Sequence, residues 1–425
     1  MNYSINIKKP AVLKNQNLVK LLLAQACSNV AANIIFFTVL NLLFIKSQSV
    51  AVTGMITALY FLPGVFLGVI SGVVVDRVNK RKIFITTNLI QAGIVLLFLI
   101  IAQKPFLAFP LILFYSLFDE FFNPAVGALL PDIANKKYLG EINTIWLFIT
   151  HGAIVFGSIG ATLLLRTLDN YQIIFPLVSG LLILGLIPIL LIPKKLTNHQ
   201  NGFKEALTYL DIEQFLSDIK NGLNYIKNNK IILFPILFLA SAQTVVATGI
   251  ALTPVFATML KINIVDTSLL VVSPSVIGAI LGGAYVSQII KKKTIRKKDL
   301  IQRGLIFSAV SLIILVIITY FTKPYFFSWF FFIVLGFFFI SSIIPAQTLI
   351  QENSPITVRG RVYGTLNMLM SLASLAPLLL TISLTEILGI KSILILAAGI
   401  FIFAAYLLKR NEKKLFYHLN HQDEK

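Results

Sequence analysis

Long apolar runs separated by short polar breaks occupy nearly the whole chain. Twelve such runs are centred near residues 32, 63, 93, 118, 154, 183, 244, 278, 310, 337, 373 and 399. Each can cross a bilayer core of about 30 Å, which takes about 20 apolar residues in a helix. The runs are continuous rather than alternating, so they favour helices over a β-barrel. The sequence therefore predicts an all-α membrane protein with twelve transmembrane helices.

One long polar stretch, residues 193–230, interrupts this pattern. It predicts an N-terminal six-helix half at 1–192, a cytoplasmic linker at 193–230, and a C-terminal six-helix half with a tail at 231–425. Apolar residues recur at helical spacing inside the linker, which predicts an amphipathic helix along the membrane face. These residues are Ile212, Phe215, Ile219, Leu223 and Ile226. A tether between the halves and a regulatory role are both open for this segment.

Composition supports the membrane assignment and explains the net charge. The chain is 57% hydrophobic and 12% charged, against about 25% charged residues in a soluble domain. The net charge is +19, but most Lys and Arg fall in the predicted loops of one face. Such an excess marks the cytoplasmic side, so we expect both termini in the cytoplasm of an inner-membrane protein and no nucleic-acid partner. The opposite side holds Lys46, Lys104, Arg166, Lys261, Lys323 and Lys391.

The sequence lacks the common signatures of ATP-dependent and metal-dependent chemistry. No G-x-x-x-x-G-K-[ST] segment is present, and no His, Cys, Asp or Glu group has metal-ligand spacing. A single cysteine, Cys27, excludes an internal disulfide. We therefore expect a monomer that is not an enzyme and uses neither a cofactor nor a metal.

The turn between the second and third runs carries Gly72, Asp76 and Arg77, followed by Lys80-Arg81-Lys82. This pattern resembles the signature loop of the major facilitator superfamily of transporters. Asn79 stands where that family usually has glycine, and asparagine also tolerates the left-handed conformation. Asn123-Pro124-Ala125 is echoed by Ile344-Pro345-Ala346, as expected of two parallel repeats. The resemblance implies two six-helix halves that rock to give alternating access.

The resemblance also implies a cytoplasmic gate built around this loop. Gly72 would let the second helix pack closely against the eleventh, and Asp76 would face the N-terminus of the eleventh, whose free N–H groups favour an anion. Arg77 and Arg81 would reach acids across the same face. A basic loop that only sets topology is the alternative. The expected gate residues are Gly72, Asp76, Arg77, Arg81, Asp132, Glu141, Arg359, Gly360 and Arg361.

Two adjacent acids in the fourth run are the sharpest chemical feature. Asp119 lies 12 residues before Pro131, or about 18 Å along a helix, which places it near the membrane midplane. A charge there costs about 2.5–3.5 kcal/mol, so Asp119 or Glu120 should face a cavity or a partner and exchange protons. Asn123, one turn on, favours Asp119 as the cavity-facing member. A structural ion pair or interhelical hydrogen bond is the alternative.

Other polar residues inside apolar runs are candidates for the same cavity. Gln25, Asn29 and Asn33 form one stripe on the first helix and face either the cavity or a neighbouring helix. His151 is either a proton relay or a packing residue. The resemblance places the first, fourth, seventh and tenth helices around the cavity, which adds Gln243 of the seventh.

Two further segments resemble the drug-efflux branch that includes macrolide and siderophore exporters. They are Phe121 to Ala125 with Leu130-Pro131-Asp132, and Pro345-Ala346-Gln347 with Arg359-Gly360-Arg361-Val362. The resemblance implies proton-coupled efflux of an amphipathic small molecule. A symporter or a lipid transporter on the same fold is the alternative. A polytopic membrane enzyme and a channel subunit are less favoured, because the non-cytoplasmic loops are short and nearly free of acids.

Overall fold

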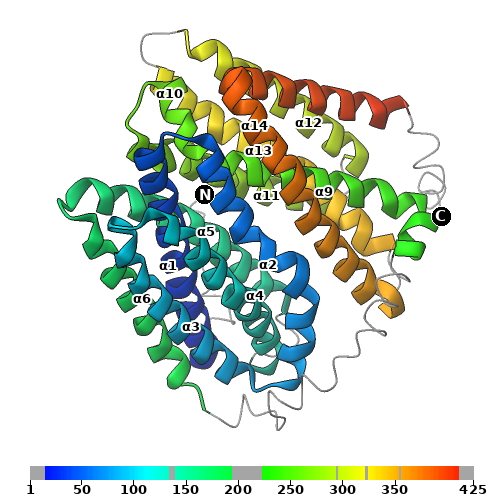
Figure 1. The fold of residues 1–425 in the computed structure, drawn as a ribbon. Helices are drawn as coiled ribbons and strands as arrows, with labels where there is room; N and C mark the ends of the chain where they lie inside the picture. Colours follow the sequence, from blue (N-terminus) through cyan, green and yellow to red (C-terminus); the bar gives the residue numbers. More distant parts are fainter. Residues whose placement is uncertain are drawn as a thin grey trace, which may run out of the picture.

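The computed structural model describes residues 15–133, 139–193, 223–292, 295–320, 324–353 and 356–410. These residues form long helices joined by short turns (Figure 1). Helices are the expected solution for apolar runs, because a helix satisfies its backbone N–H and C=O groups internally where lipid offers no partner.

The N-terminal half contains six long helices, and the polar breaks of the sequence mark their ends. They are α1 (Gln16–Ser47), α2 (Val50–Arg77), α3 (Lys80–Leu97), α4 (Ala108–Ile133), α5 (Leu139–Thr167) and α6 (Ile174–Leu190). Asn79 caps α3, because its side chain accepts the N–H of Lys82. The φ of Asn79 is −59°, so the expectation of a left-handed conformation at this position is wrong. The residue acts as an N-cap instead.

The C-terminal half repeats the pattern with more irregular connections. Its long helices are α9 (Lys230–Ala251), α11 (Ser273–Lys292), α12 (Lys297–Ile318), α13 (Pro324–Asn353) and α14 (Ile356–Arg410). Between α9 and α11 lie η7 (Thr253–Val255), α10 (Phe256–Leu260), the 3-10 turn η8 (Ile264–Asp266) and the π-helical η9 (Ser268–Val272).

Helix α14 accounts for two of the twelve predicted spans. Within the described residues, 11 helices are long and apolar enough to cross a membrane, and the last of them covers 43 residues. Gly389 breaks this helix with a φ of 76°, a conformation that glycine adopts far more readily than other residues. The chain can therefore cross twice within α14, and the prediction of an all-α protein with two six-helix halves is confirmed.

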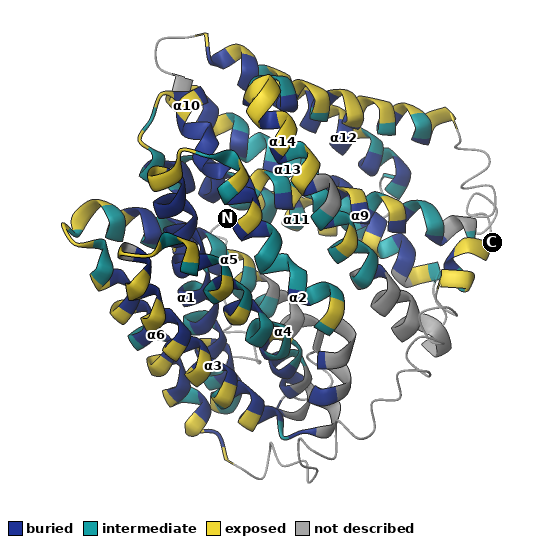
Figure 2. Cartoon of the chain, in the orientation of Figure 1, coloured by how far each residue is buried: buried dark blue, intermediate teal, exposed yellow. Residues whose placement is uncertain are grey.

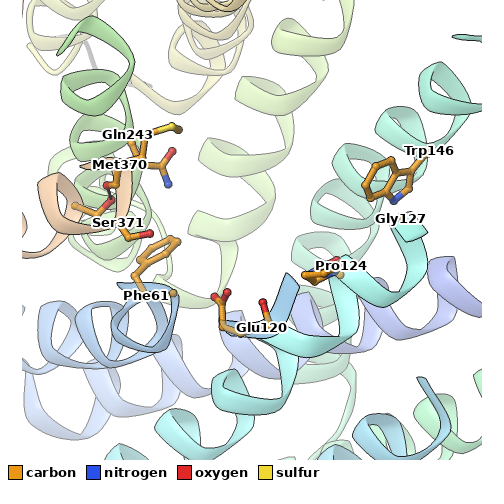
Figure 3. A pocket seen from close by; sticks show the side chains of 12 residues that line it. Phe61, Glu120, Pro124, Gly127, Trp146, Gln243, Met370 and Ser371 are labelled. Carbon is orange, nitrogen blue, oxygen red and sulfur yellow. Dashed lines mark hydrogen bonds between the residues drawn. The ribbon is translucent and has the colours of Figure 1, made fainter. Parts of the chain in front are cut away.

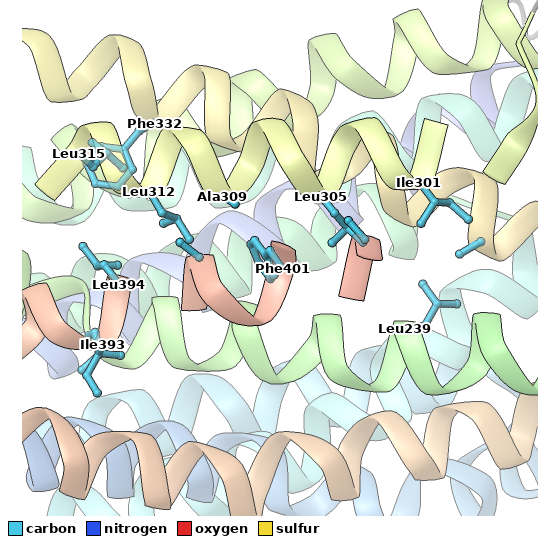
Figure 4. Close-up of a cluster of buried hydrophobic side chains, with 14 of the residues drawn as sticks. Leu239, Ile301, Leu305, Ala309, Leu312, Leu315, Phe332, Ile393, Leu394 and Phe401 are labelled. Atoms are coloured by element: carbon cyan, nitrogen blue, oxygen red, sulfur yellow. The ribbon is translucent and has the colours of Figure 1, made fainter. Parts of the chain in front are cut away.

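Each half has its own apolar core. The core of the C-terminal half joins α9, α12, α13 and α14, where side chains such as Leu305, Leu312 and Phe401 interlock (Figure 4). Many large apolar side chains are nevertheless exposed on the outside of the bundle, as Figure 2 shows. Exposure of this kind suits a surface that faces lipid tails.

The largest contacts between the two halves are made by α2 and α5. Helix α2 of the N-terminal half packs against α14, and α5 packs against α11 and η9. Gly54 of α2 touches Ile382 of α14 so closely that a Cβ on Gly54 would collide with that side chain. These two contacts frame the space in which the candidate site lies.

Little of the predicted linker falls within the described residues. Residues 223–228 form a short helix in which Ile226 is buried in the core of the C-terminal half and Leu223 is exposed. The amphipathic pattern at Ile212, Phe215 and Ile219 lies outside the described residues, so the helix expected there stays a prediction.

Candidate functional site

Two ends of the bundle serve as reference points. We call the end with the α2–α3 turn at Val78 and Asn79 the basic face, and the end with the α1–α2 turn at Gln48 and Ser49 the opposite face. The basic face contains the loops that are rich in Lys and Arg, and the sequence predicts that this face is cytoplasmic.

A cavity of about 420 Å³ lies between the two halves, and we call it the central cavity (Figure 3). Helices α2, α4 and α5 contribute to it from the N-terminal half, and α9 and α14 from the C-terminal half. From α2, α4 and α5 the lining extends from the middle of the helices, at Phe61 and Glu120, toward the basic face, at Ser71, Gly127 and Trp146. Its described lining is Phe61, Gly64, Ser71, Glu120, Asn123, Pro124, Gly127, Trp146, Gln243, Met370, Ser371 and Ser374.

Glu120 brings a carboxyl group into this cavity. It lines the space where α4, α2 and α14 converge, and Gly64 of α2 leaves room for it. A Cβ on Gly64 would lie 3.0 Å from Oε1 of Glu120 and 3.4 Å from Oγ of Ser371. Among the described side chains Glu120 has no hydrogen-bond or ion-pair partner, so its carboxyl can bind a proton or a ligand.

Asp119 points away from the cavity and into the N-terminal half. Its carboxylate accepts long hydrogen bonds from the Tyr60 hydroxyl (3.4 Å), Gln91 Nε2 (3.4 Å) and Asn123 Nδ2 (3.5 Å). The interpretation that favoured Asp119 as the cavity-facing acid is therefore wrong. Neighbouring residues on a helix point about 100° apart, and the packing of α4 on α2 and α3 directs Asp119 inward and Glu120 toward the cavity.

The polar stripe on α1 faces α5 rather than the cavity. Gln25 is fully buried and donates to the Thr150 hydroxyl of α5 at 3.3 Å, while Asn33 packs on Gly157. Asn33 also donates to the carbonyl of Asn29 at 2.8 Å. None of the three stripe residues is in the described lining of the cavity, so the alternative of interhelical contact holds for them.

The other candidates divide between cavity and surface. Asn123 and Gln243 line the cavity, as expected. His151 is exposed on α5 and lies outside the described lining. No sequence signal distinguished the apolar lining residues Phe61, Trp146 and Met370, because a large apolar side chain in a membrane helix gives the same pattern whether it faces lipid or a cavity.

Contacts between the halves close the opposite face. Arg166 of α5 pairs with Asp266 of η8 at 2.7 Å. Close by, Asn41 Nδ2 donates to the Ser268 hydroxyl at 3.2 Å, and the Thr162 hydroxyl donates to the carbonyl of Val265 at 2.9 Å. These three contacts join α1 and α5 to the segment that leads into α11.

A second cluster of contacts ties α2 to α14 at the same face. Glu386 accepts hydrogen bonds from the Ser49 hydroxyl at 3.1 Å and from the backbone N–H of Ala51 at 2.9 Å. A carboxylate suits this position, because the first N–H groups of α2 lack partners within the helix. In the sequence Arg166, Asp266 and Glu386 are isolated charges near the predicted non-cytoplasmic side, and their opposite signs are the one signal of pairing.

Only part of the predicted cytoplasmic gate can be compared with the structure. Arg81 is buried and donates to the carbonyls of Leu190 and Ile192, both at 2.7 Å, which ties the start of α3 to the end of α6. The other predicted gate residues fall within described helices, but their side chains are not described, so the expected contacts stay a prediction: Gly72, Asp76, Arg77, Asp132, Glu141, Arg359, Gly360 and Arg361. The described residues include no group of three or more His, Cys, Asp and Glu that could hold a metal ion.

A cavity between two six-helix halves, closed at one membrane face, is the architecture of a multi-pass membrane transporter with alternating access. The chain matches the model of the Major Facilitator Superfamily over residues 21–377 and belongs to that superfamily.

Two curated relatives come from Bacillus subtilis (strain 168), and both are described as uncharacterized MFS-type transporters. YkuC is 27% identical over 226 residues, which span 52% of each chain, so this chain covers about half the length of that relative. YfiS is 21% identical over 383 residues, or 87% of each chain.

Solved transporter structures share the fold at low sequence identity. The POT family transporter PepTSo aligns with a TM-score of 0.73 and 11% identity over 95% of this chain and 99% of its own. The nucleoside transporter NupG aligns with a TM-score of 0.65 and 14% identity, over 93% and 99%. A bacterial homologue of the human lysosomal transporter Spinster, in an inward-facing and unoccupied conformation, aligns with a TM-score of 0.69 and 13% identity, over 92% and 95%.

Proposed function

We propose that this chain is a proton-coupled exporter of an amphipathic small molecule in the inner membrane. The basic face is cytoplasmic in this proposal, and the structure represents the state whose cavity is reached from the cytoplasm. Resemblance of the segments at Phe121–Ala125 and Arg359–Val362 to the drug-efflux branch supports export. The protein is then a transporter without an enzymatic activity of its own.

The observation that carries the proposal is the position of Glu120. A carboxyl group that lines a central cavity, without a partner among the described side chains, can take up a proton in one state and release it in the other. An intramembrane acid is costly, and its usual use is in a substrate or proton pathway. Coupling follows if the protonated and substrate-bound forms of Glu120 alternate during the cycle.

The contacts at the opposite face supply the second element of the cycle. The ion pair of Arg166 with Asp266 and the Glu386 cap on α2 join the halves only while that face is closed. Outward opening has to break these contacts, and the predicted gate at Asp76 would form in exchange. Two sets of contacts on opposite faces give a two-state element that substrate and protons can bias.

Uphill transport in proteoliposomes tests the proposal. Vesicles with the purified protein receive a pH gradient, and the accumulation of cationic, neutral and anionic amphiphiles is measured. Antiport predicts accumulation when the vesicle interior is acidic, whereas symport predicts accumulation when the exterior is acidic. A protein that shows no gradient-dependent accumulation of any class would refute proton-coupled transport.

Paired variants isolate the role of the cavity acid in this assay. Glu120→Gln should abolish gradient-driven accumulation while leaving the protein folded. Glu352→Gln is the matched control, because Glu352 is half-exposed at the end of α13, where it pairs with Lys297. Undiminished uphill transport by Glu120→Gln would remove Glu120 from the coupling mechanism.

A further inference from the structure

We propose that the central cavity selects monovalent organic cations with an apolar body. This inference rests on the proposed transport function and names the class of its substrate. The charged nitrogen or phosphorus centre would lie against Glu120, and the apolar body would lie between Phe61 and Trp146.

The charge of the lining favours a cation. Glu120 is the one ionisable side chain among the described lining residues, and Asp119 lies directly behind it on α4. The Tyr60 hydroxyl and Gln91 Nε2 donate to Asp119, but they are neutral groups and leave its charge uncompensated. An ionised Glu120 therefore creates a negative potential, which is strong in a region shielded from water.

The apolar part of the lining favours a bulky body around that charge. Phe61 projects into the cavity beside Glu120, and Trp146 and Pro124 lie on the other side (Figure 3). Aromatic faces attract cations, and they also pack well on apolar groups. Met370 of α14 adds an unbranched side chain that adapts to different shapes.

Size and polarity set further limits on the ligand. A volume of about 420 Å³ falls within the range of roughly 300–1,000 Å³ for small-molecule sites. The neutral polar side chains of Asn123, Gln243 and Ser371 can exchange hydrogen bonds with a ligand that carries a few polar groups.

The other two charge classes fit the lining less well. An anion would place like charges together at Glu120, at a cost that grows as water is excluded. A neutral ligand would remove water from the carboxylate without supplying a compensating charge, which is also unfavourable. A cation both replaces the lost water and neutralises the carboxylate.

Equilibrium binding of two probes of the same shape tests the inference. Tetraphenylphosphonium and tetraphenylborate differ mainly in the sign of their charge, and binding to the detergent-purified protein needs no pH gradient. We expect wild type to bind the phosphonium at least tenfold more tightly than the borate. Glu120→Gln should weaken phosphonium binding at least tenfold without weakening borate binding, and Glu120→Asp should retain most of the preference.

Matched controls separate binding from folding. Phe61→Ala should weaken phosphonium binding severalfold, whereas Phe156→Ala should not, because Phe156 is 68% exposed on the outside of α5. Glu352→Gln should bind the phosphonium like wild type. Thermal unfolding of each purified variant would identify any that fails to fold.

Three results would overturn the inference: no measurable phosphonium binding, equal affinity for both probes, or full phosphonium affinity in a folded Glu120→Gln protein. These results are distinct from failure of the proposed function. If neutral amphiphiles alone accumulate against a gradient, proton coupling stands and the cation inference falls. If the phosphonium binds through Glu120 but no pH gradient drives accumulation of any amphiphile, the cation inference stands and proton coupling falls.

Discussion

Arg166 of α5 and Asp266 of η8 form an ion pair across the boundary between the two halves, with Nε of the arginine 2.7 Å from the carboxylate. The pair joins residues 100 positions apart in the sequence. The Arg166 side chain is 58% exposed, whereas that of Asp266 is only 12% exposed. The pair is therefore partly screened by solvent on one side, and its contribution is closer to that of a surface pair than of a buried one.

The first prediction concerns this pair. Asp266→Asn should weaken closure of the opposite face by about 1 kcal/mol, after allowance for the exposure of Arg166. That amount shifts the ratio of the two conformations about fivefold toward opening at the opposite face. Cysteine at Thr162, in a Cys27→Ala background, should then react faster with a membrane-impermeant thiol reagent added at that face. Charge reversal of both partners, Arg166→Asp with Asp266→Arg, should restore the slow rate; an unchanged rate in Asp266→Asn would show that the pair does not hold the face closed.

The second prediction separates the two adjacent acids. Asp119 is held by Tyr60 and Gln91, so Asp119→Asn should slow gradient-driven transport severalfold without abolishing it, and Tyr60→Phe should produce a similar loss. Both substitutions act indirectly, because they change the rotation of α4 and therefore the position of the Glu120 side chain in the cavity. Initial transport rates and the steady-state accumulation ratio can be measured for each variant. If Asp119→Asn eliminates accumulation while Glu120→Gln retains it, the roles of the two acids have to be exchanged.

The third prediction tests the orientation of the α1 stripe. Cysteine at Asn29 or Asn33 should react at least tenfold more slowly with small hydrophilic thiol reagents than cysteine at Gln243 or Ser371. Asn33 packs against Gly157 of α5 and Asn29 is buried, whereas Gln243 and Ser371 line the cavity. Reaction rates in a Cys27→Ala background provide the measurement. Comparable rates at all four positions would place the stripe in contact with the cavity water.

The fourth prediction concerns the contact of α1 with α5. A Cβ on Gly157 would collide with Cβ and the backbone of Asn33, so Gly157→Ala should destabilise the protein by about 1–3 kcal/mol through overpacking. Gly152→Ala is the control on the same helix, because its Cβ would meet no atom within 4 Å. Thermal unfolding in detergent should show a lower midpoint for the first variant only. Equal midpoints would mean that α1 and α5 can separate without cost.

The fifth prediction concerns the basic-face gate, which rests on the sequence resemblance. Asp76→Asn should favour the conformation open at the basic face, because the expected contact of Asp76 with the start of α14 exists only when that face is closed. A partly buried charge–dipole contact is worth up to about 2 kcal/mol, or a factor of about 30 in the ratio of states. Cysteine probes near Gly360 should gain reactivity, and probes near Lys46 should lose it. Ser287→Ala, at the corresponding place in the second half, should change little. If the cysteine probes at both faces of the Asp76→Asn protein react as in wild type, the loop sets only the membrane topology and forms no gate.

The sequence by itself determined the number of helices, the approximate centre of each and the division into two halves. Hydropathy along the chain is enough for this, because a bilayer of fixed thickness demands helical runs of about 20 apolar residues. It also identified Asp119 and Glu120 as costly intramembrane acids, since that cost depends on depth and not on the neighbouring helices.

Only the tertiary structure decided which way each polar group points. Helix α4 is apolar on most sides, and lipid tails are as apolar as a packed core, so no amphipathic signal fixes its rotation. Packing on α2 and α3 sets that rotation, turning Asp119 to Tyr60 and Glu120 to the cavity. The pairing of Arg166 with Asp266 likewise depends on how the halves dock, because contacts between distant segments leave no periodic trace in either one.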